Sequence, residues 1–100
     1  MKSLSFSWDN RKNNSNQKKH AVSFEEAQTV FFDENAIEYF DPDHSDEEDR
    51  FVLIGNSYKK RLLIVVHTER ENRTRIISAR KTTKNERKQY EENAKRSRHA

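Results

Sequence analysis

The spacing of apolar residues changes along the chain, and each change predicts a different element of secondary structure. Apolar and polar residues alternate over residues 4–8, which is typical of a short strand. Asp9 can cap a helix over residues 10–20, although that segment has almost no apolar stripe. Ser23 and Glu26 then have the spacing of a capping box, ahead of a helix of roughly two to three turns. The N-terminal third therefore predicts a strand followed by two helices.

Four later segments have the composition of strands. Residues 36–40 form the first, and residues 50–57 (RFVLIGNS) give a stronger signal. Residues 61–68 (RLLIVVHT) give the strongest, because their apolar run is rich in β-branched residues and bounded by charge. The short link at 58–60 predicts an antiparallel hairpin between these two strands. Residues 73–80 (RTRIISAR) supply the last strand of the predicted meander.

A C-terminal helix is predicted after the last strand. Thr83 and Glu86 form a second capping box, and the helix that they open carries Tyr90. We expect one domain over residues 1–94 and a basic, disordered tail over residues 95–100. The fold class is α+β, with an antiparallel sheet of about four to five strands, two N-terminal helices and one C-terminal helix.

Composition excludes several classes of protein. The chain has 31% hydrophobic and 37% charged residues and no cysteine. The missing cysteine rules out a disulfide scaffold, a thiolate zinc site and a cysteine nucleophile. The longest apolar run, residues 62–66, is too short to span a bilayer, and the first ten residues lack the apolar run of a signal peptide. We therefore expect a cytoplasmic protein that does not contact a membrane.

The charge is distributed unevenly. Residues 1–50 contain 6 Lys and Arg against 12 Asp and Glu, a net charge of −6. Residues 51–100 contain 14 against 5, a net charge of +9. A basic half favours a polyanion such as nucleic acid, because neutralising phosphates supplies much of non-specific affinity. A solvated basic surface without a ligand explains the same composition.

Three groups of residues form an ordered signature. The first is Phe6-x-Trp8-Asp9, Lys12, Asn16, Lys19-His20 and Val22-Ser23-Phe24-Glu25-Glu26-Ala27. The second is Asp43-His44-Ser45, Arg50-Phe51, Ile54-Gly55, Ser57, Arg61-Leu62 and Thr68-Glu69-Arg70. The third is Arg75-Ile76-Ile77-Ser78-Ala79-Arg80, Glu86-Arg87 and Tyr90. In order and spacing these residues resemble the BrnT family of bacterial toxins, with departures at Ala21, Glu34 and Lys60.

The resemblance implies a fold, an activity and a set of partners. The fold is RelE-like, and the activity is that of a ribonuclease acting on cellular RNA. The partner is a BrnA-like antitoxin of the ribbon-helix-helix type, in a heteromeric complex that represses its own operon. In such a complex the antitoxin reads the operator DNA, so the toxin contacts that DNA indirectly. The alternative is a non-catalytic module, a decayed toxin that binds antitoxin or nucleic acid and serves only as a co-repressor.

RNA carries its own nucleophile, the 2′-hydroxyl group, and can therefore be cleaved without a metal ion. The protein must then supply a base, an acid for the leaving 5′-oxygen and cations around the phosphate. The chain contains no HExxH motif and no clear cluster of carboxylates and histidines. A mechanism that needs no metal and no cofactor is the simpler hypothesis.

Four residues are candidates for catalysis. Arg80 can hold the scissile phosphate in a bidentate manner, with a structural salt bridge to Glu86 as the alternative. His67 can act as a general acid or base, although a half-exposed strand histidine is as plausible. Glu69 can supply a base, unless it belongs to a solvated turn. Arg61 can contact phosphate, with an ordinary solubilising charge of an edge strand as the alternative.

Five further residues are candidates for RNA binding. Surface solubility explains their charges equally well, and Tyr90 has docking of the last helix as its stronger alternative. These residues are Lys59, Arg70, Arg75, Arg87 and Tyr90.

Strand parity sorts some of these side chains, because successive residues of a strand point to opposite faces. In residues 61–68 it places Arg61 and His67 on one face. In residues 73–80 it places Arg80 with Ile76, and Arg75 on the opposite face.

Overall fold

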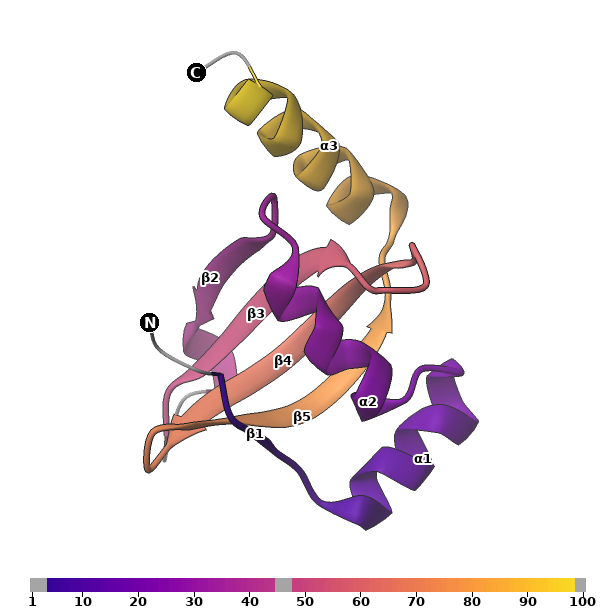
Figure 1. Ribbon diagram of the computed structural model, residues 1–100, viewed down its shortest axis with the longest axis vertical. Coiled ribbons are helices and arrows are strands. Elements are labelled where there is room, and N and C mark those ends of the chain that lie inside the picture. Colours follow the sequence, from indigo (N-terminus) through magenta and orange to yellow (C-terminus); the bar gives the residue numbers. More distant parts are fainter. Residues whose placement is uncertain (1–3, 45–47, 99–100) are drawn as a thin grey trace.

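The computed structural model describes residues 4–44 and 48–98, which form one α+β unit (Figure 1). None of the helices in these two ranges is long and apolar enough to cross a membrane. The elements, in chain order, are β1 (Phe6–Ser7), α1 (Asn10–His20), α2 (Phe24–Ala27), the 3-10 helix η1 (Gln28–Phe32), β2 (Ile37–Asp41), the 3-10 helix η2 (Pro42–His44), β3 (Arg50–Asn56), β4 (Leu62–Arg70), β5 (Arg73–Lys81) and α3 (Lys84–Arg98).

The five strands form one sheet in the order β1-β5-β4-β3-β2. Strands β2 to β5 are a meander of antiparallel pairs, as the sequence predicted. The two-residue β1, shorter than the predicted strand, pairs with β5 in the parallel orientation, so the prediction of a purely antiparallel sheet was wrong. The reason is topological: the chain crosses from one sheet edge to the other through α1, α2 and η1 after leaving β1, and a parallel pair needs such a crossover.

The two faces of the sheet are covered differently. On the first, which we call the helical face, the apolar core lies between the sheet and the segment that runs through α2 and η1, which crosses in front of the central strands in Figure 1. On the second, the α3 face, α3 covers only one end through Tyr90 and Ala94. Figure 1 shows α3 extending beyond this end of the sheet. The buried apolar residues of the helical face are Val22, Phe24, Ala27, Val30, Leu53, Leu63, Val65, Ile76 and Ala79.

Helix α1 has the predicted bounds and docks through polar residues. The Asp9 carboxylate caps it by accepting from two backbone amides of the first turn. Asn16 is buried and joins α1 to the sheet: its amide donates to the carbonyls of Val22 and Ala79, both at 2.8 Å, and its oxygen accepts from the Ala79 N–H. These hydrogen bonds hold α1 against the sheet, because its sequence has almost no apolar stripe that could do so.

The second predicted helix is interrupted after one turn. Ser23 caps α2 by accepting from the Glu26 N–H at 3.0 Å, as predicted. Thr29 then donates to the Glu26 carbonyl at 2.7 Å and so competes with the α-helical pattern, and the chain continues as the 3-10 helix η1. The predicted helix of two to three turns is therefore a four-residue α-helix followed by five residues of 3-10 helix.

Helix α3 begins as predicted and is longer than expected. Thr83 and Glu86 form the capping box in both directions, with N–H to side-chain oxygen distances of 2.7 and 3.3 Å. The helix continues to Arg98, so most of the segment 95–100 that we expected as a disordered tail is helical. Residues 99 and 100 lie outside the described residues.

Candidate functional site

A β-bulge divides β5. Up to Val66 the pairing is regular and Val66 lies opposite Ser78, but His67 lies opposite Ile76. Ile77 is therefore an extra residue with no partner on β4. Such a bulge reverses the alternation of side chains along the rest of the strand.

The bulge overturns the faces that parity assigned. Ile76 and Ala79 are three positions apart, yet both lie in the core of the helical face. Arg75 pairs with Thr68, and Arg80 with Ile64, so both arginines lie on the α3 face. The prediction that placed Arg75 opposite Arg80 was wrong, because it assumed an unbroken strand.

The result is a row of arginines along one side of the α3 face. Arg73 pairs with Arg70 at the end of β4. Because Arg73 is two positions from Arg75 in a regularly paired part of β5, the two side chains lie on the same face. Four arginines therefore share this face: Arg70, Arg73, Arg75 and Arg80. Ile76 and the other β5 residues between them that point to the helical face are buried. Of the residues predicted from the sequence, the structure thus places three on one face: Arg70, Arg75 and Arg80.

Arg80 is held by a carboxylate. Its two terminal nitrogens donate to the two oxygens of Glu86, both at 2.8 Å, and one also reaches the Lys81 carbonyl at 3.1 Å. This pair lowers the pKa of Glu86 to about 2, with the Arg80 hydrogen bond as the largest cause. The salt bridge to Glu86, which was the alternative role predicted for Arg80, is present. However, 42% of the arginine side chain is exposed, so it remains accessible to a ligand.

Tyr39 lies on the same face, and the sequence analysis did not single it out. It pairs with Val52 on β3, and 44% of it is exposed. Burial raises the pKa of the Tyr39 hydroxyl, and the negative charge of Glu86 raises it further while Arg80 opposes this shift. The phenol is therefore protonated at neutral pH and lies within the electrostatic field of the Arg80–Glu86 pair. Its only sequence signal is an aromatic residue in the alternating segment IEYFD.

His67 lies on the helical face, away from Arg80. It is 1% exposed and packs between Phe31 and Phe51, with ring centroids 4.8 and 5.8 Å away. Burial lowers its pKa to about 4. The Glu38 carboxylate lies 3.1 Å from Nε2, but neither ring nitrogen has a hydrogen-bond partner among the described residues. The alternative of a half-exposed strand histidine was therefore wrong, and this burial argues against the predicted role as general acid or base.

Arg61 is tied into a structural network on the helical side. Its guanidinium donates to both carboxylate oxygens of Glu26 and, at 3.0 Å, to the Ala21 carbonyl. Glu26 is 1% exposed and also accepts from the Ser57 hydroxyl at 2.7 Å. Arg61 lowers the pKa of Glu26 more than any other group does. The contacts of Arg61 thus join α2 to the β3–β4 hairpin and hold its side chain on the opposite face of the sheet from the arginine row.

Glu69 is also distant from Arg80. Its carboxylate accepts from the Thr74 hydroxyl at 2.9 Å, near the β4–β5 turn. Five positions on β4 separate Glu69 from Ile64, the partner of Arg80, which is a distance of about 17 Å along the strand. The four residues predicted as catalytic therefore do not form one site.

The remaining predicted contacts are scattered. Tyr90 is buried; its hydroxyl donates to Asp33 at 2.7 Å, so its observed contact is the docking of α3. Lys59 is exposed in the β3–β4 hairpin, with its amine 5.8 Å from the Tyr58 ring centroid. Arg87 is exposed on α3.

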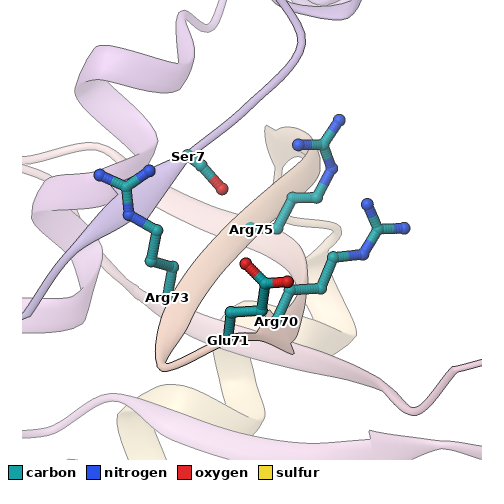
Figure 2. A pocket seen from close by; sticks show the side chains of 5 residues that line it. All are labelled: Ser7, Arg70, Glu71, Arg73 and Arg75. Carbon is teal, nitrogen blue, oxygen red and sulfur yellow. The ribbon is translucent and has the colours of Figure 1, made fainter.

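A pocket of about 510 Å³ lies at the β4–β5 turn, at the far end of the arginine row. Figure 2 shows Arg70 and Arg75 extending in the same direction, with Arg73 nearer to the β1 segment that carries Ser7. The pocket is lined by Ser7, Arg70, Glu71, Arg73 and Arg75. Within the described residues, no group of three or more His, Cys, Asp or Glu side chains is arranged to hold a metal ion.

Comparison with known proteins agrees with this fold. A model of the family described as the ribonuclease toxin BrnT of type II toxin-antitoxin systems matches residues 8–86. The crystal structure of the Brucella abortus ribonuclease toxin BrnT is similar, with a TM-score of 0.62 and 19% identity, over 82% of this chain and 100% of that one. No curated protein matches the chain. Because the family match extends over most of the sequence, in agreement with its motifs, the chain belongs to the BrnT family of ribonuclease toxins.

Proposed function

We propose that this protein is a cytoplasmic endoribonuclease toxin that binds cellular RNA across its α3 face and cleaves it without a metal ion. The observation that carries the proposal is the group formed by Arg80, Glu86 and Tyr39 on that face. It combines a partly exposed arginine, a carboxylate and a protonated phenol in one electrostatic environment. Family membership supports the ribonuclease activity.

Arg80 supplies the phosphate contact. A planar guanidinium can hold two non-bridging phosphate oxygens at once and stabilise the negative charge that develops at phosphorus. In the free protein Glu86 occupies the terminal nitrogens of Arg80. A phosphate that binds Arg80 would compete with this carboxylate, so Glu86 positions the arginine until RNA arrives.

Glu86 then becomes the proton acceptor. Its pKa of about 2 makes it a weak base in the free protein, and the Arg80 hydrogen bond is the largest cause of that low value. When phosphate takes over Arg80, the pKa of Glu86 rises toward that of an ordinary carboxyl group, and its basicity increases. The carboxylate can then accept the proton of the 2′-hydroxyl, whose oxygen attacks phosphorus.

Tyr39 is the proton donor to the leaving group. Cleavage breaks the bond between phosphorus and the 5′-oxygen, which must receive a proton. The raised pKa of Tyr39 keeps its hydroxyl protonated at neutral pH. The products of this sequence are a 2′,3′-cyclic phosphate and a free 5′-hydroxyl.

The test is cleavage of purified RNA by the purified protein in excess EDTA. Arg80→Ala should reduce kcat by about 10²-fold or more, the loss typical of removing one stabilising donor. Tyr39→Phe should slow cleavage while leaving RNA binding intact. Lys18→Ala, on the exposed side of α1, is the control and should cleave like wild type. Cleavage that needs a divalent ion would refute the metal-free mechanism, and full activity of Arg80→Ala would refute this site.

The second part of the proposal concerns the partner. The toxin-antitoxin family implies an antitoxin, and we propose a BrnA-like protein of the ribbon-helix-helix type that covers part of the basic α3 face. The complex would then repress its own operon through the antitoxin. A complex that leaves Arg80 as accessible as in the free toxin would contradict this mode of inhibition.

The alternative is a non-catalytic module that acts only as a co-repressor. Both functions predict RNA binding that weakens with salt, so binding does not distinguish them. Cleavage does: growth arrest on induced expression with RNA left intact would favour the alternative.

A further inference from the structure

The pocket at the β4–β5 turn is separate from the Arg80 group, and we propose that it is a second phosphate-binding subsite for the backbone of the bound RNA. This inference rests on the proposed function, because it takes the ligand to be the RNA that Arg80 positions. The subsite would hold a phosphate several nucleotides away from the bond that is cleaved.

The first argument is the convergence of charge. Arg70, Arg73 and Arg75 line one pocket of about 510 Å³, and Glu71 is the only acidic residue among its lining residues. Like charges gathered in this way repel one another, so the arrangement favours a polyanion that neutralises them. Guanidinium groups suit phosphate in particular, because their donors match two of its oxygens. Ser7 adds a hydroxyl donor on the β1 side.

The second argument is that the three arginines are unequally occupied. Arg70 forms a bidentate pair with Glu48, with both distances 2.8 Å. Arg73 donates to the neutral Ser5 hydroxyl at 3.1 Å. The Arg75 side chain has no hydrogen bond or ion pair within residues 4–44 and 48–98, although its charge helps to lower the pKa of Asp9 and Glu48. Arg73 and Arg75 are therefore available to a ligand without breaking an ion pair.

The third argument is the backbone geometry that places these side chains. If Ile77 paired regularly with β4, the unbroken register would direct Arg73 and Arg75 to the opposite face from Arg80. The bulge brings them onto the α3 face. Bulges are over-represented next to functional sites, where they redirect a side chain. A charge needed only for solubility requires no such feature.

The distance between the two sites predicts a dependence on RNA length. Arg75 pairs with Thr68 and Arg80 with Ile64, four positions apart on β4, or about 13 Å. A dinucleotide bound at Arg80 cannot also fill the pocket, whereas a longer single strand can. The subsite should therefore lower KM for long RNA and leave kcat for a dinucleotide unchanged.

The binding experiment measures the affinity of full-length protein for a single-stranded RNA oligomer over a range of salt concentrations. Each lost phosphate contact should reduce the slope of log K against log salt by about 0.7. Arg73→Gln with Arg75→Gln should therefore lower the slope by about 1.4. Glu48→Gln should increase affinity, because it releases Arg70. Lys18→Gln, at an exposed lysine on α1 outside the pocket, is the control for general loss of charge.

The cleavage experiment separates this proposal from the proposed function. If wild type cleaves both substrates, the double variant should keep its dinucleotide activity and show a raised KM for long RNA. If no protein cleaves RNA, the nuclease fails, but the salt slopes still test the subsite. Unchanged slopes in a double variant with a wild-type circular dichroism spectrum would overturn the subsite. The subsite would also be overturned if the double variant kept its RNA affinity and lost only its affinity for the antitoxin, since the pocket would then bind an acidic protein segment.

Discussion

Arg75 and Arg80 lie on the same face of the sheet although five positions separate them along β5. In an unbroken strand an odd separation puts two side chains on opposite faces. The register shift opposite Val66 and His67 supplies the extra residue that brings both onto the α3 face. One irregularity in the backbone thus keeps Ile76 in the core of the helical face and aligns the arginines on the other.

His67 gives a prediction about stability and pH. Its ordinary pKa is 6.5 and its pKa in the folded chain is about 4, so the unfolded chain binds more protons between these values. The stability associated with the neutral imidazole is complete above pH 6.5 and falls as the pH drops to 4, by about 3 kcal/mol at most. His67→Phe should remove this loss, as measured by urea unfolding at several pH values.

The same variant tests whether His67 takes part in catalysis. His67→Phe removes both titratable nitrogens and keeps an aromatic ring between Phe31 and Phe51. We expect cleavage to be retained at temperatures where the variant is folded, even if the larger ring costs about 1–3 kcal/mol in packing. A folded variant with no activity would show that the imidazole is needed and that the conformation described here is not the active one.

Arg61 gives a prediction about a buried charge. Arg61→Ala leaves the carboxylate of Glu26 buried with the Ser57 hydroxyl, and should cost about 3 kcal/mol of unfolding free energy at pH 7. It also removes the largest cause of the low pKa of Glu26. The stability that wild type gains from this carboxylate is complete above the ordinary pKa of 4.5 and is lost as the pH falls below it, so this loss on acidification should be smaller in the variant.

The control for Arg61 is the double variant with Glu26→Gln, which removes the buried charge and should recover part of the lost stability. Urea unfolding measures both proteins, and the cleavage rate is measured well below their melting temperatures. A rate as low as that of Arg80→Ala, in a folded Arg61→Ala protein, would restore a direct catalytic role to Arg61.

Much of the fold follows from local pattern, and the exceptions have identifiable causes. The capping residues Asp9, Ser23 and Thr83 mark helix starts correctly, because a cap depends on neighbours two or three positions away. The parallel pairing of β1 depends on β5, nearly seventy positions later, and no local pattern records it. The bulge at Ile77 also has no local sequence signal, since RTRIISAR has the pattern of an ordinary strand.

The candidate site was predicted only in part for the same reason. Arg80 was found because it closes a motif, whereas the position of Tyr39 depends on the register of four strands, β2 to β5. His67 and Arg61 have suitable chemistry, but burial and an ion pair determine what they do, and both depend on contacts from distant segments. Sequence identifies side chains that are able to act, and tertiary contacts decide which are available.

Asn16 gives a prediction about the polar helix α1. Its side chain makes three buried hydrogen bonds, two as donor and one as acceptor. Asn16→Asp keeps the size but replaces the donating amide with an oxygen, which faces the carbonyls of Val22 and Ala79. We expect a loss of about 2–4 kcal/mol in the free energy of unfolding at pH 7, since two acceptors lose their donor and a charge is buried. Asn14→Asp, exposed on the same helix, should change it little; equal effects would mean that α1 is not held by these bonds.

Tyr90 separates docking of α3 from contact with RNA. Its hydroxyl donates to Asp33 at 2.7 Å and accepts from the Asn56 amide at 3.1 Å, on a side chain that is 7% exposed. Tyr90→Phe keeps the ring against the sheet and should cost about 1–2 kcal/mol of stability, because both partners lose a hydrogen bond. Amide hydrogen exchange should be faster in α3, while the salt dependence of RNA binding should remain that of wild type. A lower salt slope or weaker RNA binding at unchanged α3 protection would instead make Tyr90 an RNA contact, because docking alone predicts the opposite combination.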